Sequence, residues 1–305
     1  MDSAARVRFE RPDLDQITSN HAVVDLHFHS TYSDGLNRID KIAARARKMG
    51  IGLAITDHNA IGGALEIDQY QDVFTIPGIE ITAAEGSHLL VYFYDTRTLR
   101  QFYEKEVVPY MGAGVMSSLS LPMIDIVKRT RPYRCLTIFP HPYCAMYTGI
   151  CNPQFSDGEL HHLLHMVDGI EAINANNLNK WNLKCAVLGF NLGSAMVAGS
   201  DGHSLGHMGR AVSYARCAKT RNDFLEAVRH HKNHVIGKEV DLLSKVTANS
   251  LKLRSSVGNC QDLLEKNFRY SRKVINMKSR AIRSNFQRRL HARFNQRPVS
   301  DDWGL

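Results

Sequence analysis

The 305-residue chain has no apolar run that approaches the roughly 20 residues of a membrane-spanning helix. Its first residues, MDSAARVRFERPDLDQ, are charged throughout and lack the apolar core of a signal peptide. Six cysteines show neither C-x-x-C spacing nor a dense framework, which speaks against a disulfide scaffold and indicates free thiols in a reducing compartment. We therefore expect a cytoplasmic protein.

Net charge is nearly absent from most of the chain, although the whole chain carries +8. Residues 250–305 hold 13 Lys or Arg and only 4 Asp or Glu, so the positive charge is concentrated near the C-terminus. This composition predicts a boundary near residue 249 and makes the tail a candidate for an anionic partner. We divide the chain into an N-terminal segment at 1–19, a main domain at 20–248 and a basic tail at 249–305.

Apolar residues in the tail recur at steps of four and seven, which predicts a basic amphipathic helix. Such a helix can pack on the main domain, pair with a second subunit, lie on an anionic membrane surface or bind RNA phosphates. The sequence leaves these alternatives open. The apolar residues of the predicted helix are Leu264, Phe268, Ile275, Ile282, Phe286, Leu290 and Phe294.

Seven short apolar or β-branched runs in the main domain predict strands. Helix-like segments lie between several of them, and strands that alternate with helices favour a parallel sheet, either a barrel or a doubly wound fold. No G-x-G-x-x-G follows a strand, which counts against a dinucleotide-binding fold. The predicted strands are 22–27, 52–58, 73–80, 87–94, 135–141, 168–174 and 195–203, and the predicted helices are 38–50, 122–131, 157–167 and 179–190.

Side chains that can bind metal stand at the ends of most of these strands. In DLHFHSTYSDG, His27 and His29 are two residues apart, so both imidazoles project to the same side of a strand. In parallel barrels the carboxyl ends of the strands form the active site. His88 is the exception, because it opens its strand. The other polar residues in such positions are Asp57, His58, Glu80, His141, Glu171, Asn174, Asp201 and His203.

Five motifs together resemble the PHP family, the polymerase and histidinol phosphatase metal-dependent phosphoesterases: DLHFHSTYSDG, ITDHNAIGG, IPGIEIT, FPHPY and GSDGH. The resemblance covers about residues 20–240 and is nearest to stand-alone members that act on nucleotides and short oligonucleotides. It implies an α/β fold, a distorted (β/α)7 TIM-like barrel, which the basic helical tail would extend. It also implies two to three divalent metal ions at the rim of the barrel.

The resemblance assigns nine residues of this chain to metal ions by position. Imidazole and carboxylate ligands together suit Mn²⁺, Fe²⁺ or Zn²⁺. The implied sets are His27, His29, Glu80 and Asp201 for a first ion, Asp34, His58 and a bridging Glu80 for a second, and His88, His141 and His203 for a third, which makes a trinuclear centre.

Four further roles are hypotheses about the reaction. We hypothesise that a hydroxide between the first two metals attacks phosphorus, and that His203, if it is not fully committed to the third metal, protonates the leaving group. Asp57 would orient an imidazole through a hydrogen bond, or would serve only as a turn residue at the end of its strand. Asn174 and Arg210 are candidate substrate-binding residues. Their alternatives are a capping role for Asn174 and an ordinary surface position for Arg210.

The leading functional interpretation is a metal-dependent phosphoesterase, a hydrolase of ester bonds. Its substrate would be a nucleotide, 3′-phosphorylated or cyclic, or a short RNA. One alternative is a sugar- or amino-alcohol-phosphate phosphatase, like the histidinol phosphatase branch. Another is a nucleic-acid-binding accessory module with a structural metal site. All nine ligand positions are filled, which favours an enzyme.

Overall fold

A computed structural model describes residues 6–144, 148–152 and 154–240 of the protein. The predicted basic tail, residues 249–305, lies outside the described residues. The strands are β1 (Val7–Arg8), β2 (Ala22–Phe28), β3 (Gly52–Ile55), β4 (Gly78–Thr82), β5 (His88–Phe93), β6 (Cys135–Phe139), β7 (Gly169–Asn174), β8 (Ala195–Gly199), β9 (Ala211–Ala215) and β10 (His234–Gly237). The α-helices are α1 (Leu14–Thr18), α2 (Ile39–Met49), α3 (Gly62–Ile67), α4 (Thr96–Phe102), α5 (Met123–Thr130), α6 (Asp157–Leu164), α7 (Asn179–Leu192) and α8 (Arg221–Arg229).

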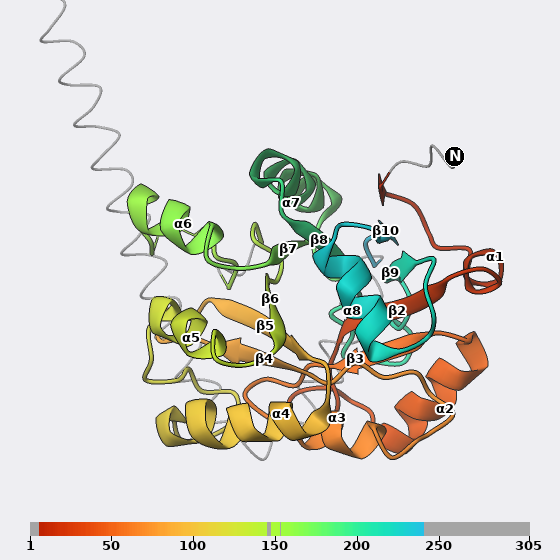
Figure 1. Ribbon diagram of the computed structural model, residues 1–305, viewed down its shortest axis with the longest axis horizontal. Coiled ribbons are helices and arrows are strands. Elements are labelled where there is room, and N and C mark those ends of the chain that lie inside the picture. The colour runs from red at the N-terminus through yellow and green to blue at the C-terminus, as the bar shows by residue number, and fades with distance from the viewer. Residues whose placement is uncertain (1–5, 145–147, 153, 241–305) are drawn as a thin grey trace, which may run out of the picture. The chain divides into compact units, whose positions relative to one another are not determined.

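The described strands form two five-stranded sheets, and the helices lie around them (Figure 1). The first sheet has the order β1-β10-β9-β2-β3, and the second has the order β4-β5-β6-β7-β8. Strands β2 and β3 pair in parallel, as do β6, β7 and β8. Strand β5 runs antiparallel to both of its neighbours, and β9 runs antiparallel to β10 and β2. The fold is therefore mixed α/β, and only part of it has the predicted parallel pairing.

No closed barrel is detected among the described residues, so closure of a TIM-like barrel stays a prediction. The two sheets approach each other through isolated bridges instead of continuous ladders. Leu53 with Thr75 and His58 with Glu80 join the segments of β3 and β4, and Phe28 with Gly202 joins β2 to the segment after β8. These bridges bring the ends of β2, β3, β4 and β8 to one place.

Each of the seven predicted strands is present, and the four predicted helices form as α2, α5, α6 and α7. Helix α2 ends where the sequence predicts, because Gly50 takes a left-handed φ of 65° that a residue with a side chain rarely adopts. The strands β1, β9 and β10 were not predicted. They are two to five residues long; β1 precedes, and β9 and β10 follow, the seven runs from which strands were predicted.

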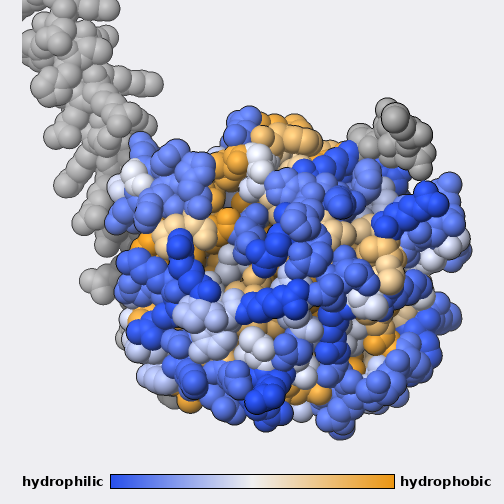
Figure 2. Space-filling model, viewed as in Figure 1, coloured by the Kyte–Doolittle hydropathy of each residue, from blue (hydrophilic) through white to orange (hydrophobic). Residues whose placement is uncertain are grey.

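Apolar side chains from the strands and the inner helix faces make up the core, and most of the visible surface in Figure 2 is hydrophilic. Within this core the hydroxyl of Tyr92 on β5 donates a 2.7 Å hydrogen bond to the carbonyl oxygen of Leu26 on β2. Tyr92 is fully buried and ties the second sheet to the strand that carries His27. In the described part of the chain, no helix combines the length and the apolar character that crossing a membrane requires.

We predict that Tyr92→Phe lowers the free energy of unfolding by about 1–3 kcal/mol, because it removes the donor from a buried hydrogen bond. Urea denaturation of the purified protein measures this. The matched control is Tyr133→Phe, whose hydroxyl bonds Glu106 in a partly exposed setting, and it should cost less than about 1 kcal/mol. Equal costs for the two changes would contradict the structural role assigned to Tyr92.

Candidate metal centre

Glu80 on β4 stands in the middle of the imidazoles that the sequence pointed to. Its Oε2 lies 3.1 Å from Nδ1 of His58 and 3.4 Å from Nε2 of His27. Nε2 of His29 lies 3.5 Å from the same oxygen. Three imidazoles from β2 and from the end of β3 therefore face one carboxylate oxygen.

The other oxygen of Glu80 faces two further imidazoles. Its Oε1 is 2.9 Å from Nδ1 of His88 and 3.5 Å from Nε2 of His141. His88 was the exception among the predicted residues, because it opens its strand. Strand β5 runs antiparallel to β4, with His88 opposite Thr82 at the end of β4. The start of β5 therefore lies at the same edge as the end of β4.

Two more carboxylates lie next to this group. Asp201 Oδ1 is 3.2 Å from Nε2 of His29 and 3.6 Å from Nε2 of His27. Asp34 Oδ1 is 3.1 Å from Nε2 of His203. The side chains of the nine predicted ligands are thus brought together, and none is more than 17% exposed.

Electrostatics keeps the carboxylates charged inside the protein. Burial by itself raises the pKa of Glu80, but His88, His58 and His27 bring that pKa well below its usual range. Burial lowers the pKa of His58 to about 3, so this imidazole is neutral near pH 7. A neutral imidazole offers a nitrogen lone pair to a cation.

Several buried polar atoms of this cluster have no hydrogen-bond partner among the described residues: Nε2 of His27, both ring nitrogens of His29, Nδ1 of His58 and Oε2 of Glu80. Such atoms are costly unless something compensates them. Metal–ligand bonds of about 2.0–2.2 Å would compensate them and leave neighbouring ligand atoms about 3 Å apart. The donor set, imidazole nitrogens with carboxylate oxygens, therefore fits Mn²⁺, Fe²⁺ or Zn²⁺.

Three groups have ligand atoms close enough to share one ion, within 4.8 Å of one another. The grouping of His203 differs from the one that the resemblance implied, because the structure places it with Asp34 and not with His88 and His141. The loop at 30–37 explains this grouping. Leu36 N donates a 2.8 Å hydrogen bond to the carbonyl oxygen of His203, which holds His203 beside the loop that carries Asp34. The groups are His27, His29 and Asp201, then His29, Asp34, His58 and His203, then His58, Glu80 and His88.

Glu171 on β7, one of the polar residues that the sequence analysis noted at the strand ends, supports the site although the resemblance assigned it to no metal ion. One of its oxygens, Oε1, lies 3.0 Å from Nδ1 of His27, and Oε2 accepts from the backbone N–H of His141 at 2.9 Å and from Asn174 Nδ2 at 2.9 Å. With the Nδ1 proton held by Glu171, the Nε2 lone pair of His27 faces Glu80 and Asp201. The only signal in the sequence was a glutamate on a strand among apolar residues.

Asp57 does not make the predicted hydrogen bond to an imidazole. It accepts instead from Ser30 N and Ser30 Oγ, both at 2.7 Å, and from Ser33 Oγ at 2.6 Å. Asp57 bonds these groups because the turn at 30–33 places the donors of Ser30 and Ser33 beside the end of β3. Asp57 therefore holds the loop that carries Asp34.

Asn174 and Arg210, the predicted substrate-binding residues, lie in different surroundings. The amide of Asn174 donates to Asp201 Oδ2 at 3.3 Å, and its Oδ1 accepts from Asn176 N and Asn177 N. It therefore supports Asp201 and caps the turn after β7, which agrees with the capping alternative. Arg210 is not among the residues that surround Glu80, and it lines a separate cavity.

Two candidate ligands have strained backbones. His141 has a φ of 31° and Asp201 a φ of 49°, and few residues with a side chain take such values. Each costs on the order of 1–3 kcal/mol. The hydrogen bond from the His141 N–H to Glu171 and the bonds around Asp201 hold these conformations. Strain of this kind concentrates at functional sites.

Two family models match the chain. The PHP domain matches residues 25–137, and the PHP-associated model matches residues 181–233. The error-prone DNA polymerase of Mycobacterium tuberculosis is 27% identical over 128 residues, which cover 37% of this chain and 12% of the polymerase. That of Symbiobacterium thermophilum is 40% identical over 72 residues, 22% of this chain and 7% of the polymerase. The chain thus corresponds to a small part of these polymerases.

Solved structures share the fold at low identity. Endonuclease Q in complex with a 27-mer duplex carrying an abasic lesion has 17% identity and a TM-score of 0.56, over 72% of this chain and 60% of that one. PsfC from Pseudomonas syringae has 17% identity and a TM-score of 0.55, over 77% and 99%. A two-domain protein of Bacteroides vulgatus, described as PHP-like, has 16% identity and a TM-score of 0.53, over 77% and 70%.

We predict that Glu171→Gln weakens Mn²⁺ binding by about 10–100-fold, measured by calorimetric titration of chelator-treated protein. The carboxylate of Glu171 accepts hydrogen bonds at both oxygens, whereas the amide of a glutamine accepts at only one. The NH₂ group of the glutamine would therefore face either the N–H of His27 or the donors of His141 and Asn174, and one of these contacts would be lost. The control is Glu159→Gln, which changes the exposed capping box of α6 and should leave Mn²⁺ affinity unchanged. Unaltered affinity in Glu171→Gln would refute this role for Glu171.

Proposed function

We propose that the chain is a metal-dependent phosphoesterase of the PHP family, a hydrolase of phosphate esters, because the PHP domain model and the PHP-associated model both match it. The observation that supports this most directly is the cluster around Glu80. Six imidazoles and three carboxylates from distant parts of the chain meet there, and the nitrogens of His27 and His29 that face the cluster lack hydrogen-bond partners in the described structure. We assign the activity to the main domain, residues 20–248.

The proposed ligands are the nine residues named above, and they would hold two to three divalent ions, Mn²⁺, Fe²⁺ or Zn²⁺. When bound, such ions neutralise phosphoryl oxygens and lower the pKa of water from 15.7 toward about 7. Glu80 suits a shared position, because each of its oxygens faces a different set of imidazoles. Glu171 fixes His27 with its Nε2 toward the cluster.

His203 is the residue that we assign to proton transfer. Its Nδ1 lies 2.9 Å from the carbonyl oxygen of Asp201, which can only accept, so Nδ1 carries a hydrogen there. The exchangeable position is then Nε2, beside Asp34 at the accessible side of the cluster. When Nε2 does not hold a metal ion, it can carry a proton and give it to a leaving oxygen. Asp57, through its bonds to Ser30 and Ser33, positions the loop of Asp34 and touches no reacting atom.

We propose a nucleotide or nucleic acid as the substrate, either a 3′-phosphorylated or cyclic nucleotide or a short RNA. Support comes from Endonuclease Q, whose fold is similar and whose structure holds a DNA duplex, and from the polymerases that match part of the chain. A sugar- or amino-alcohol-phosphate phosphatase is the enzymatic alternative. A substrate screen with Mn²⁺-loaded protein, covering nucleotides, short RNAs and sugar phosphates, separates the two.

We predict that Glu80→Gln lowers the rate of Mn²⁺-dependent phosphodiester hydrolysis by at least about 100-fold. Residues that only orient a metal ligand typically cost about 10–100-fold in activity when they are changed, so a ligand should cost at least as much. The change removes one negative charge that lies among His27, His58 and His88. Initial rates on a short RNA or on a chromogenic phosphodiester measure the effect. Retained turnover in Glu80→Gln would exclude this carboxylate from the reaction.

The same assays test the metal itself. Chelator should abolish hydrolysis by the unchanged protein, and added Mn²⁺ should restore it. Elemental analysis should find two to three ions per chain. A nucleic-acid-binding accessory module with a degenerate site should contain none, and one with a structural metal site should contain metal but show no hydrolysis. Circular dichroism of Glu80→Gln checks that a lost rate does not come from a lost fold.

A further inference from the structure

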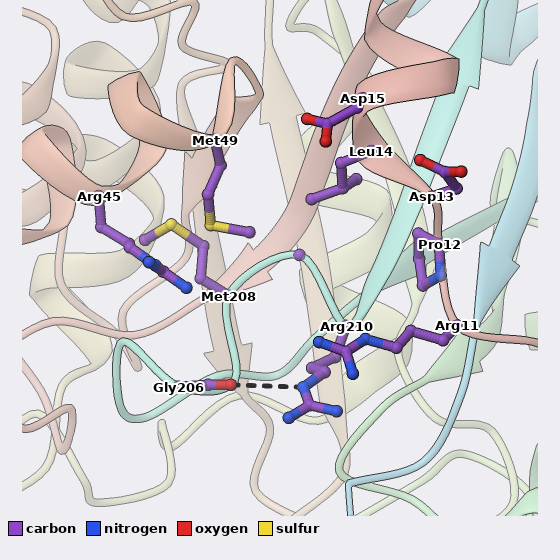
Figure 3. Close-up of a pocket in the computed structure, with 11 residues that line it drawn as sticks. Arg11, Pro12, Asp13, Leu14, Asp15, Arg45, Met49, Gly206, Met208 and Arg210 are labelled. Carbon is purple, nitrogen blue, oxygen red and sulfur yellow. Dashed lines mark hydrogen bonds between the residues drawn. The ribbon is translucent and has the colours of Figure 1, made fainter.

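A separate cavity of about 280 Å³ lies between the chain before α1, helix α2 and the loop that precedes β9 (Figure 3). None of its lining residues belongs to the cluster around Glu80. The walls are held by close packing, because a side chain at Gly209 would meet the Cε of Met49 at 2.6 Å. Gly209 N also donates to Asp25 Oδ2 at 2.9 Å, which fixes the loop to β2. The cavity is therefore built by contacts between segments far apart in sequence.

Three arginines from three segments line this cavity: Arg11 before α1, Arg45 on α2 and Arg210 before β9. In the described part of the chain, none of them forms an ion pair with a carboxylate within 4.0 Å. Asp13 and Asp15 also line the cavity, but Figure 3 shows their carboxylates apart from the guanidinium groups. The three guanidinium groups of the lining are therefore not paired with its two carboxylates.

Arg45 shows most clearly that a ligand is needed. Its Nε is buried and has no hydrogen-bond partner in the described structure. A buried donor on a charged group is costly when nothing accepts from it. Arg47, two residues further along the same helix, is paired with Asp72 on the surface. Arg6 and Arg8 also have a buried Nε without a partner in the described structure, but of these three arginines only Arg45 lines the cavity.

We propose that this cavity binds a phosphoryl group, at a site distinct from the metal centre. Guanidinium groups match phosphate oxygens with two parallel hydrogen bonds, and they keep their charge at any physiological pH. Met49, Met208 and Leu14 give the cavity apolar walls, which suit a sugar or base next to the phosphate. Its volume is just below the 300–1,000 Å³ range of sites for drug-sized ligands, so one phosphoryl group with its neighbouring atoms fits.

The phosphoryl group can come from two sources, a phosphate of a nucleotide or RNA, or free inorganic phosphate. The cavity adjoins the loop that follows His203: Gly206 accepts a 3.5 Å hydrogen bond from Arg210 Nε, and Leu205 N bonds Asn37 Oδ1 at 3.2 Å. A group bound there would therefore contact the same loop that leads from the metal centre. This path makes a remote phosphate of a larger substrate the favoured source.

The test uses full-length protein treated with chelator and titrated with inorganic phosphate by calorimetry, and with a labelled short RNA by fluorescence anisotropy. Arg45→Met keeps an unbranched apolar stem but removes the guanidinium group and its charge, and it should weaken binding at least about tenfold. Arg45→Lys should recover only part of the affinity, because an ammonium group lacks the planar fork. The matched control is Arg47→Met, which should bind like the unchanged protein.

Each source gives its own result. Arg45-dependent binding of inorganic phosphate identifies free phosphate as a ligand, and Arg45-dependent binding of RNA alone identifies a substrate phosphate. The proposal fails if Arg45→Met and Arg210→Met bind both probes as tightly as the unchanged protein, or if neither probe binds that protein. Melting temperatures of both variants check their folding. Since no metal or turnover is involved, a failure here leaves the proposed phosphoesterase activity untouched.

Discussion

The buried negative charge of Glu80 is the constraint on which the rest of the site depends. A carboxylate with 1% of its side chain exposed is stable only if positive charge or hydrogen-bond donors surround it. Here five imidazoles face its two oxygens, and Asp201 and Asp34 add further negative charge nearby. His58 is neutral near pH 7. Burial by itself lowers the pKa of His27 and His141, but neighbouring carboxylates, Glu80 among them, raise the pKa of both, so without metal these two imidazoles can hold protons that offset the charge. Divalent cations would replace those protons and use the same nitrogen lone pairs.

The fold meets this constraint by bringing several strand ends to one edge. Strand β2 delivers His27 and His29, and the bridges between β3 and β4 put His58 beside Glu80. The antiparallel direction of β5 is as important as the parallel pairs, because it returns the chain to the same edge at His88. The surrounding hydrogen bonds then fix the ligands, chiefly through Glu171 and Asp57.

Much of the site and of the strands that carry it was predictable from the sequence, because both depend on local sequence patterns. The period of two in DLHFH places both imidazoles on one side of a strand, and the polar ends of the apolar runs mark the edge of the site. The seven predicted strands are present for the same reason. The partners of Glu171 and Asp57 were not predictable, because they lie 144 and 24–27 residues away in sequence. The direction of β5 also depends on tertiary pairing, which hydrophobic periodicity does not report.

Arg210 lies in a place that its residue type could not indicate. The planar fork of an arginine suits a phosphate wherever it lies, so Arg210 after GSDGH was a candidate phosphate ligand, with an ordinary surface position as the alternative. The structure puts Arg210 with Arg45 and Arg11, in a cavity whose lining includes none of the imidazoles. Clustered imidazoles and carboxylates suit cations, whereas unpaired guanidinium groups suit anions. If the arginine cavity binds a phosphoryl group as proposed, the loop after His203 would join it to the metal centre, and a phosphorylated ligand would be held at two points.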